Sequence, residues 1–329
     1  MSGRGLNSSP VASVRRYGVP YKGSKNSLAR WVVANLPRCS TLVDAFAGGC
    51  AVTHAAMEAR LAKSYIANDI DGAGVDLFVQ SVRGVPREWF RWVSGEEFFR
   101  RKSAPHVRLC WSFGNDGRTY IYGRDIEPYK RALWEARVNG DFALWHQFLP
   151  DSSDVSRPWL RAHAEEVREA YGRWLGRLES LERLERLQSL ERLQSLESLE
   201  RLQSLERLQS LERLQSRKVD YRELSVTDPE AVIYCDPPYR RAHGYFREDG
   251  DRIAFDHPAF YDWCERNERL TVISEYEMPR DRFAAVSERR HASRMSDKVC
   301  NIVTERLFVP IGQLEQYRRR VGVVSLFRP

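Results

Sequence analysis

The stretch TLVDAFAGG, residues 41–49, decides the fold class of this chain. Its first six residues predict a short apolar strand, and the two glycines at its end predict a tight turn. A helix is expected at 51–62 and a second strand at 63–69. Strand, glycine-rich turn, helix and strand in this order are typical of the βαβ unit of a doubly wound parallel sheet.

The same alternation returns near the other end of the chain. The segment AVIYCDPPY, 231–239, predicts an apolar strand that breaks into a Pro-Pro turn. We expect a helix at 257–267, a strand at 269–276, and a final strand pair or edge strand at 301–310. A further helix is expected at 27–36, before the first strand. The sequence therefore predicts an α/β sheet that is split by a large insertion.

Composition sets limits on the class of protein. The chain has 329 residues, of which 42% are hydrophobic, so it can bury a sizeable core. Its six cysteines lie far apart without a CxxC pair, which indicates neither a zinc site nor a disulfide framework but thiols in a reducing cytoplasm. No apolar run approaches the roughly 18 residues of a membrane span. The net charge of +7 suits a nucleic-acid partner and suits a merely basic enzyme equally well.

The inserted part of the sequence contains two unlike segments. Residues 83–150 carry five of the nine Trp and many Arg, which favours a mostly helical segment that touches DNA. Residues 178–216 consist of thirteen Leu-x-x triplets with eight Glu and six Arg. These residue types favour an α-helical arm over an extended 3-10 helix. Because each Leu falls about 60° behind the previous one on an α-helix, we expect no single apolar face and a role as a spacer or partner-contact arm.

The motif Asp236-Pro237-Pro238-Tyr239 is the strongest chemical signal, because ligands bind at the carboxyl ends of strands in open α/β sheets. An exocyclic amine of a base is a poor nucleophile, since its lone pair is delocalised into the ring. The Asp236 carboxylate and the Pro237 carbonyl can each accept one amine hydrogen and so localise that lone pair. The Tyr239 ring offers a stacking face for a flipped base. A surface Asp-Pro-Pro turn is the alternative interpretation.

Two weaker motifs precede it. In DAFAGGC, residues 44–50, an acid at a strand end is followed by glycines that open a helix, which lets the backbone approach a cofactor closely or serves only packing. In NDID, residues 68–71, an acid at the end of the second strand can accept hydrogen bonds from ribose hydroxyls or cap a helix.

Together these motifs resemble the Dam-type, DPPY-containing family of DNA adenine N6 methyltransferases. The ordered matches are Tyr21-Lys22-Gly23-Ser24-Lys25, DAFAGGC, NDID, Asp220-Tyr221 and DPPY. The resemblance covers about 15–75 and 217–310 and implies a Rossmann-like methyltransferase sheet with S-adenosylmethionine as cofactor. It further implies a catalytic domain split into 15–75 and 217–329, with an inserted helical target-recognition region at 76–177. The resemblance does not cover the repeat arm at 178–216, and composition predicts a flexible leader at 1–14.

The resemblance also assigns roles to residues. It implies a cofactor site made of Tyr21, Lys25, Asp44, Phe46, Gly48, Asp69, Asp220 and Tyr221. It implies a catalytic site made of Asp236, Pro237, Pro238 and Tyr239. One departure is Cys50, which stands where a third glycine is usual, so close backbone approach there is in doubt. The enlarged insertion means that the family's sequence specificity does not carry over.

Contacts with double-stranded DNA are expected from Arg240 and Arg241, which can grip phosphates, and from Asn115, which can read an adenine edge. Solvated surface charge and a Gly-Asn turn are the alternatives. The seven His show no metal-ligand spacing, and we expect no metal and no membrane. A cytoplasmic enzyme of a bacterium or a phage-infected cell is expected, with a role in restriction-modification or as a solitary methylase. The alternatives are the same fold acting on cytosine or RNA, and a catalytically silent DNA-binding module.

Overall fold

The computed structural model describes residues 16–141, 143–144, 193–208, 213–240, 245–246, 252–253, 255–296 and 299–325. It shows a mixed α/β protein with a seven-stranded sheet of order β3-β2-β1-β4-β7-β9-β8. The first five strands are parallel to their neighbours, whereas β9 pairs antiparallel with both β7 and β8. The strands of this sheet are β1 Cys39–Asp44, β2 Ala62–Asn68, β3 Leu214–Arg217, β4 Val232–Cys235, β7 Leu270–Glu275, β8 Phe283–Ser296 and β9 Val299–Pro310.

Each helix expected around the sheet is present, with small differences at the ends. The expected helices at 27–36, 51–62 and 257–267 are α1 Ala29–Asn35, α2 Ala51–Glu58 and α11 His257–Arg266. Helix α2 stops early because Arg60 adopts a left-handed conformation with φ of 50°. The remaining helices are α3 Ala73–Arg83, α4 Gly95–Arg101, α5 Pro105–Cys110, α6 Glu127–Trp134, α10 Gln194–Gln203 and α12 Leu314–Ser325, and a two-stranded pair is formed by β5 Tyr245–Phe246 and β6 Arg252–Ile253.

The central strands are buried on both faces, which explains why they are continuously apolar. Leu42 and Val43 are neighbours on β1, yet they belong to two different hydrophobic clusters. The cluster on one face includes side chains of α1, α2, α3 and α10, and the cluster on the other face includes those of α11. This two-sided burial is the arrangement expected for parallel strands. No helix among the described residues is long and apolar enough to cross a membrane.

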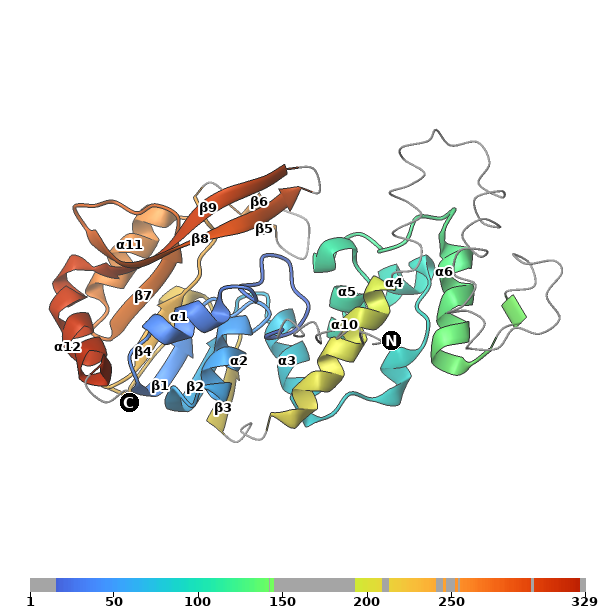
Figure 1. Ribbon diagram of the computed structural model, residues 1–329, viewed down its shortest axis with the longest axis horizontal. Coiled ribbons are helices and arrows are strands. Elements are labelled where there is room, and N and C mark those ends of the chain that lie inside the picture. Colours follow the sequence, from blue (N-terminus) through green and yellow to red (C-terminus); the bar gives the residue numbers. More distant parts are fainter. Residues whose placement is uncertain are drawn as a thin grey trace, which may run out of the picture.

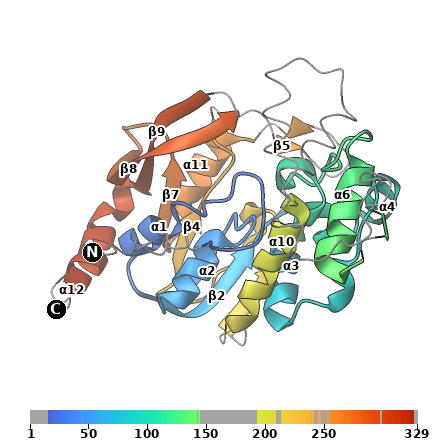
Figure 2. The ribbon, with the colours of Figure 1, turned by 45° about the vertical axis from the view of Figure 1, so that its right-hand side comes forward.

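The described part of the insertion is helical, and its buried side chains continue one of the two hydrophobic clusters of the sheet. Figures 1 and 2 show α4, α5, α6 and α10 gathered beside the sheet, with α3 between. Trp92, Trp111 and Trp134 are buried there, and the rings of Trp111 and Trp134 lie 4.8 Å apart. These tryptophans therefore stabilise the helical group rather than form its surface. The fifth Trp of this stretch, Trp145, lies outside the described residues.

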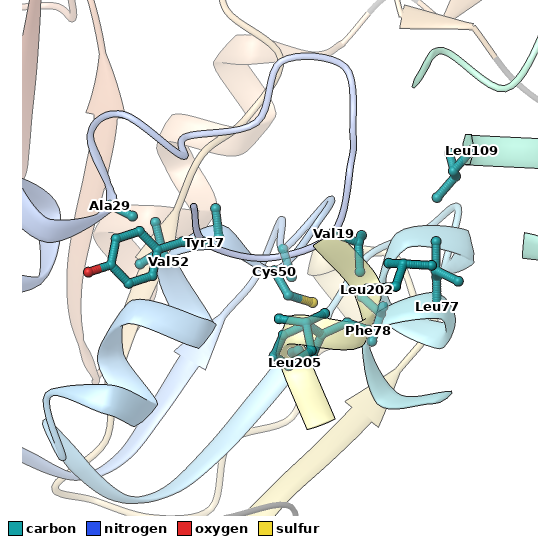
Figure 3. Close-up of a cluster of buried hydrophobic side chains, with 14 of the residues drawn as sticks. Tyr17, Val19, Ala29, Cys50, Val52, Leu77, Phe78, Leu109, Leu202 and Leu205 are labelled. Carbon is teal, nitrogen blue, oxygen red and sulfur yellow. The ribbon is translucent and has the colours of Figure 1, made fainter. Parts of the chain in front are cut away.

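The leucine-triplet repeat differs from the expected arm. Residues 214–216 belong to β3, which pairs with β2 at the edge of the sheet, so the sheet resumes inside the repeat. The α-helical prediction is confirmed for α10, but this helix packs inside the molecule (Figure 3). Its leucines and the two flanking ones are buried, namely Leu193, Leu196, Leu199, Leu202 and Leu205. Residues 178–192 and 209–212 lie outside the described part of the chain.

The physical reason is the short length of the helix. Leu196, Leu199 and Leu202 span about 120° of the α10 surface, because each is displaced by about 60° from the one before. An arc of that width fits one broad apolar face. The small side chains of Ser195 and Ser198 complete this face and are buried with the leucines. The drift that we expected to destroy an apolar face needs a longer helix to do so.

Strands β8 and β9 extend past the sheet as a two-stranded ribbon (Figure 1). Only residues 306–308 of β9 pair with β7, whereas β8 and β9 pair with each other from Phe283 and Pro310 to Ser296 and Val299. The sequence predicted a strand at 301–310, as part of a final strand pair or as an edge strand, and did not identify β8 as its partner strand. The ribbon places the inner end of β9 beside the carboxyl end of β7.

Docking of α10 can be tested with Leu199→Ala. Leu199 is fully buried, so we expect this variant to lose about 2–5 kcal/mol of unfolding free energy, measured by urea denaturation. Gln203→Ala, at an exposed position of the same helix, is the control and should change stability by less than about 0.5 kcal/mol. Equal stability of the two variants would show that the repeat does not pack as described.

Candidate active site

A cavity of about 410 Å³ lies at the carboxyl ends of β1, β2 and β4. The residues expected from sequence that line it are Tyr21, Lys25, Asp44, Phe46, Gly48, Asp69, Asp220, Tyr221, Asp236 and Pro238. They come from five motifs that are far apart in the chain. The fold therefore brings all eight expected cofactor residues and the acid of the DPPY motif to one cavity.

The glycine turn after β1 depends on very close backbone packing. Gly48 has φ of +48°, a conformation that favours glycine. A Cβ on Gly74, in α3, would lie 2.1 Å from the Gly48 carbonyl oxygen, and a Cβ on Gly49 would lie 2.6 Å from the Tyr21 Cβ. Glycine at these positions therefore allows the turn to contact the start of α3 and the segment around Tyr21.

Cys50 continues the turn in spite of its side chain. It is fully buried and adopts a left-handed conformation with φ of 58° and ψ of 31°. Its N–H donates to the Ala47 carbonyl at 2.7 Å, which closes the turn just before α2. The backbone therefore takes a conformation typical of glycine, at a steric cost of about 1–2 kcal/mol.

The acid after β2 holds the turn from the other side. The Asp69 carboxylate accepts hydrogen bonds from the Gly48 N–H at 2.9 Å and from the Asp71 N–H at 3.0 Å. Burial raises the pKa of Asp69, and these backbone hydrogen bonds partly oppose that shift. Sequence reasoning noted Asn68 without assigning it a role. Its amide bridges the Ala45 and Val219 carbonyls at 3.0 and 3.1 Å, and so joins two walls of the cavity.

Aromatic rings form another wall. Phe46 and Tyr221 have centroids 5.4 Å apart, and Phe255, which sequence reasoning missed, lies 5.9 Å from Phe46. The neighbouring Asp220 carboxylate accepts from the Arg222 Nε and from an Arg222 terminal nitrogen at 2.9 and 2.8 Å. These hydrogen bonds with Arg222 lower the pKa of Asp220, so this carboxylate is ionised.

The DPPY turn is held by buried polar contacts. Lys25 Nζ lies 2.9 Å from Asp236 Oδ1 and 4.4 Å from the centroid of the Tyr239 ring. The Tyr239 hydroxyl donates to the Glu305 carboxylate. The Pro238 carbonyl accepts from His257 Nε2 at 2.9 Å. Pro237 and Tyr239 do not line the cavity, and the Tyr239 side chain is buried.

Several acids around this turn are buried. Asp44 is 2% exposed and accepts from the Thr53 hydroxyl at 2.7 Å, yet burial raises its pKa to about 7. Burial likewise raises the pKa of Asp236, which Lys25 opposes, and raises the pKa of Glu275 to about 7. Sequence reasoning missed Glu275 and Glu305. Glu275 could have been found as an acid at the end of an apolar strand. Glu305 could have been found as an acid within an apolar strand.

Of the expected DNA contacts, Arg240 and Asn115 do not line the cavity. The Arg240 N–H donates to Glu275 at 3.2 Å, its side chain is exposed, and Arg241 lies outside the described residues. Asn115 has φ of 56°, and its amide donates to the Leu109 carbonyl at 2.8 Å. This geometry favours the Gly-Asn turn over the reading of a base edge. Among the described residues no group of His, Cys, Asp and Glu is arranged to hold a metal ion.

Comparison with known proteins gives one match, in the first part of the chain. A family model described as D12 class N6 adenine-specific DNA methyltransferase matches residues 21–83. This match supports an enzyme of the adenine-specific DNA methyltransferase kind. The match covers the Tyr21 segment, the glycine turn and Asp69, and it ends before the DPPY motif. A search of curated proteins found no match.

Burial of Asp44 predicts how the stability of the protein depends on pH. Because folding raises the pKa of this carboxyl to about 7, the native state binds more protons than the unfolded state between about pH 4 and 7. The Asp44 contribution to unfolding free energy therefore falls as pH rises through that window, by at most about 1.4 kcal/mol per pH unit. Urea titrations should show a flatter profile for Asp44→Asn than for wild type. Parallel profiles would contradict the shift.

Close packing at the glycine turn predicts a second effect. Gly74→Ala places a Cβ against the Gly48 carbonyl, so we expect a loss of about 1–3 kcal/mol of unfolding free energy from overpacking. Gly123→Ala is the matched control, because a Cβ there meets nothing within 4 Å. If urea denaturation gives the two variants the same midpoint, α3 does not press against the turn.

Proposed function

We propose that this methyltransferase transfers a methyl group from S-adenosylmethionine to the N6 amino group of adenine in double-stranded DNA. One observation carries the proposal: a single cavity is lined both by the glycine turn at Gly48 and by Asp236. A methyl donor at the turn and an amine at the acid would therefore be neighbours. The family match supports DNA adenine methylation in general.

The lining of the cavity fits the cofactor. Ala47, Gly48 and Gly49 line the cavity, so the turn presents backbone with little side chain to it, which suits a ligand held against backbone. The ring of Tyr221 suits an adenine face, and Asp69 suits ribose hydroxyls. A cavity of about 410 Å³ lies within the usual range for small-molecule sites. When bound, S-adenosylmethionine supplies an electrophilic methyl group on a sulfonium.

The DPPY turn supplies the acceptors that activate the amine. Asp236 takes one amine hydrogen as a hydrogen-bond acceptor and the Pro237 carbonyl takes the other, so the nitrogen lone pair is directed out of the ring plane. In the transfer a carbon–nitrogen bond would form as the methyl carbon–sulfur bond of the donor breaks and leaves a neutral thioether, and Asp236 would accept the proton that the nitrogen loses. Positioning of the two reacting atoms supplies most of the acceleration.

This role requires Asp236 to be ionised in a site that favours its neutral form. Burial raises the Asp236 pKa, and the ammonium of Lys25 at 2.9 Å lowers it again. Lys25 thus has a reason to lie next to Asp236, whereas sequence resemblance placed it near the methionine end of the cofactor. The two positions adjoin, because Lys25 and Gly48 line the same cavity.

The fold suggests a division of labour. We propose that the sheet is a Rossmann-like methyltransferase sheet, that residues 15–75 and the part from β3 onward form the catalytic domain, and that the helical region at 76–177 recognises the target. Two contacts tie the helices to the cavity. Arg108 of α5 pairs with Asp71 through bonds of 2.6 and 2.9 Å, and the Asn115 carbonyl accepts from the Lys22 N–H at 3.3 Å.

The proposal is tested by radiolabelled methyl transfer to unmethylated duplex DNA. We expect wild type to label the DNA and Asp236→Ala to reduce kcat by about 10²–10⁴-fold, because the acceptor of the amine hydrogen is lost. Nucleoside analysis of the product should give N6-methyladenine. Binding of S-adenosylmethionine, measured by calorimetry, controls for loss of the cavity.

Two outcomes would overturn the proposal. Wild type and Asp236→Ala that are equally inert but both shift DNA in a gel would identify a silent DNA-binding module. A methylated cytosine, or labelling of RNA instead of DNA, would assign the same fold to another substrate.

A further inference from the structure

Glu305 is a buried carboxylate that the proposed chemistry does not yet use. It lies on β9, its residue is 1% exposed, and three polar groups surround its side chain. The Tyr239 hydroxyl donates to Oε1, Lys25 Nζ lies 3.6 Å from the same oxygen, and His291 Nε2 lies 3.7 Å from Oε2. Burying a carboxylate is costly, and packing alone would be served by an apolar residue at this position.

The Lys25 ammonium contacts both groups that a target base is expected to contact, the Asp236 carboxylate and the face of the Tyr239 ring. The ammonium lies on the Asp236 oxygen, which must accept an amine hydrogen, and over the Tyr239 ring, on which a flipped base is expected to stack. An adenine cannot enter this arrangement unless the ammonium shifts. If the Lys25 ammonium leaves Asp236 but stays buried, the protein is strongly destabilised unless another anion pairs with the ammonium.

Glu305 is already placed to receive it. Its Oε1 is 3.6 Å from Lys25 Nζ, compared with 2.9 Å for the Asp236 oxygen, so a small rotation of the long Lys25 side chain changes its partner. The phenol of Tyr239 is anchored on the same carboxylate, so the ring stays fixed while the ammonium moves.

We propose that Glu305 is a positioning residue that takes over Lys25 from Asp236 when the target amine binds. The proposal rests on the proposed function. Glu305 acts through Lys25 and Tyr239 and does not touch the amine itself. Lys25 thus keeps Asp236 charged before the base enters and leaves it available afterwards.

The kinetic test uses Glu305→Gln, which removes the charge but keeps an oxygen that accepts from Tyr239. We expect kcat to fall at least tenfold while the KM for S-adenosylmethionine changes less than twofold. Glu305→Asp, which keeps the charge, should retain more of the wild-type kcat than Glu305→Gln. Glu288→Gln, at an exposed acid of β8, is the control and should leave kcat unchanged.

The variant Lys25→Met tests whether Glu305 acts through the Lys25 ammonium. If Glu305 acts through the ammonium, Glu305→Gln should cause no further loss of kcat in a chain that already carries Lys25→Met. Losses that multiply in the double variant, or a wild-type kcat for Glu305→Gln, would overturn the proposal. Circular dichroism of each variant confirms that the fold is retained, and Glu305→Asp carries the comparison if Glu305→Gln does not fold.

A second measurement needs no methyl transfer. In the Asp236→Asn background, Lys25 has lost its first carboxylate, so it should pair with Glu305 in the cofactor-free protein. Lys25→Met should then lower the urea midpoint more when Glu305 is present than when Glu305→Gln is also present. Equal shifts would overturn the proposal. Because this cycle is read from stability, it decides the role of Glu305 even if wild type fails to methylate adenine and the proposed function is wrong.

Discussion

The parallel pairing of β1 with β4 is the interaction on which the rest of the structure depends. Asp44 pairs with Tyr234, a residue far away in the sequence, and both strands are buried on both faces. This register brings the turn after β1 and the turn after β4 to one edge of the sheet. A one-residue slip would move the side chains of each strand from one buried cluster into the other, so the packing on both faces fixes the register. The cavity between the glycine turn and Asp236 follows from that pairing.

The same arrangement creates an electrostatic problem. Asp44, Asp236, Glu275 and Glu305 lie near one another in a buried region, where each ionised carboxylate loses hydration and repels the others. Lys25 is the cation that pairs with two of them. Burial raises the pKa of Asp44 and of Glu275 to about 7 and also raises the pKa of Asp236, and shifted acids of this kind are typical of sites that move protons. The charge of Lys25 is therefore as important to the site as its acids.

The leucine repeat shows how tertiary context decides the role of a local pattern. A spacing of three residues has no natural fit to an α-helix, and on that basis the segment was expected to stand apart from the fold. In the structure the helix is short, small serines lie between its leucines, and the next part of the repeat turns into an edge strand. The neighbouring helices bury α10 because they offer a broad apolar surface, which includes Phe78 and Leu77 of α3 (Figure 3).

The sequence by itself determined the βαβ order, the split of the sheet and the motifs that surround the cavity, because these depend on local alternation of apolar residues and on glycine and proline at turns. Only the tertiary structure decided that Lys25 pairs with Asp236, that Asn115 serves a turn, that Cys50 adopts a glycine-like conformation and that Glu305 lies beneath the DPPY turn. For the contacts of Lys25 and Glu305 the physical reason is distance along the chain, whereas the left-handed backbone at Asn115 and at Cys50 depends on the packing around each turn. A contact between residues hundreds of positions apart leaves no periodic mark in either segment, and it exists only once the strands that carry them are packed side by side.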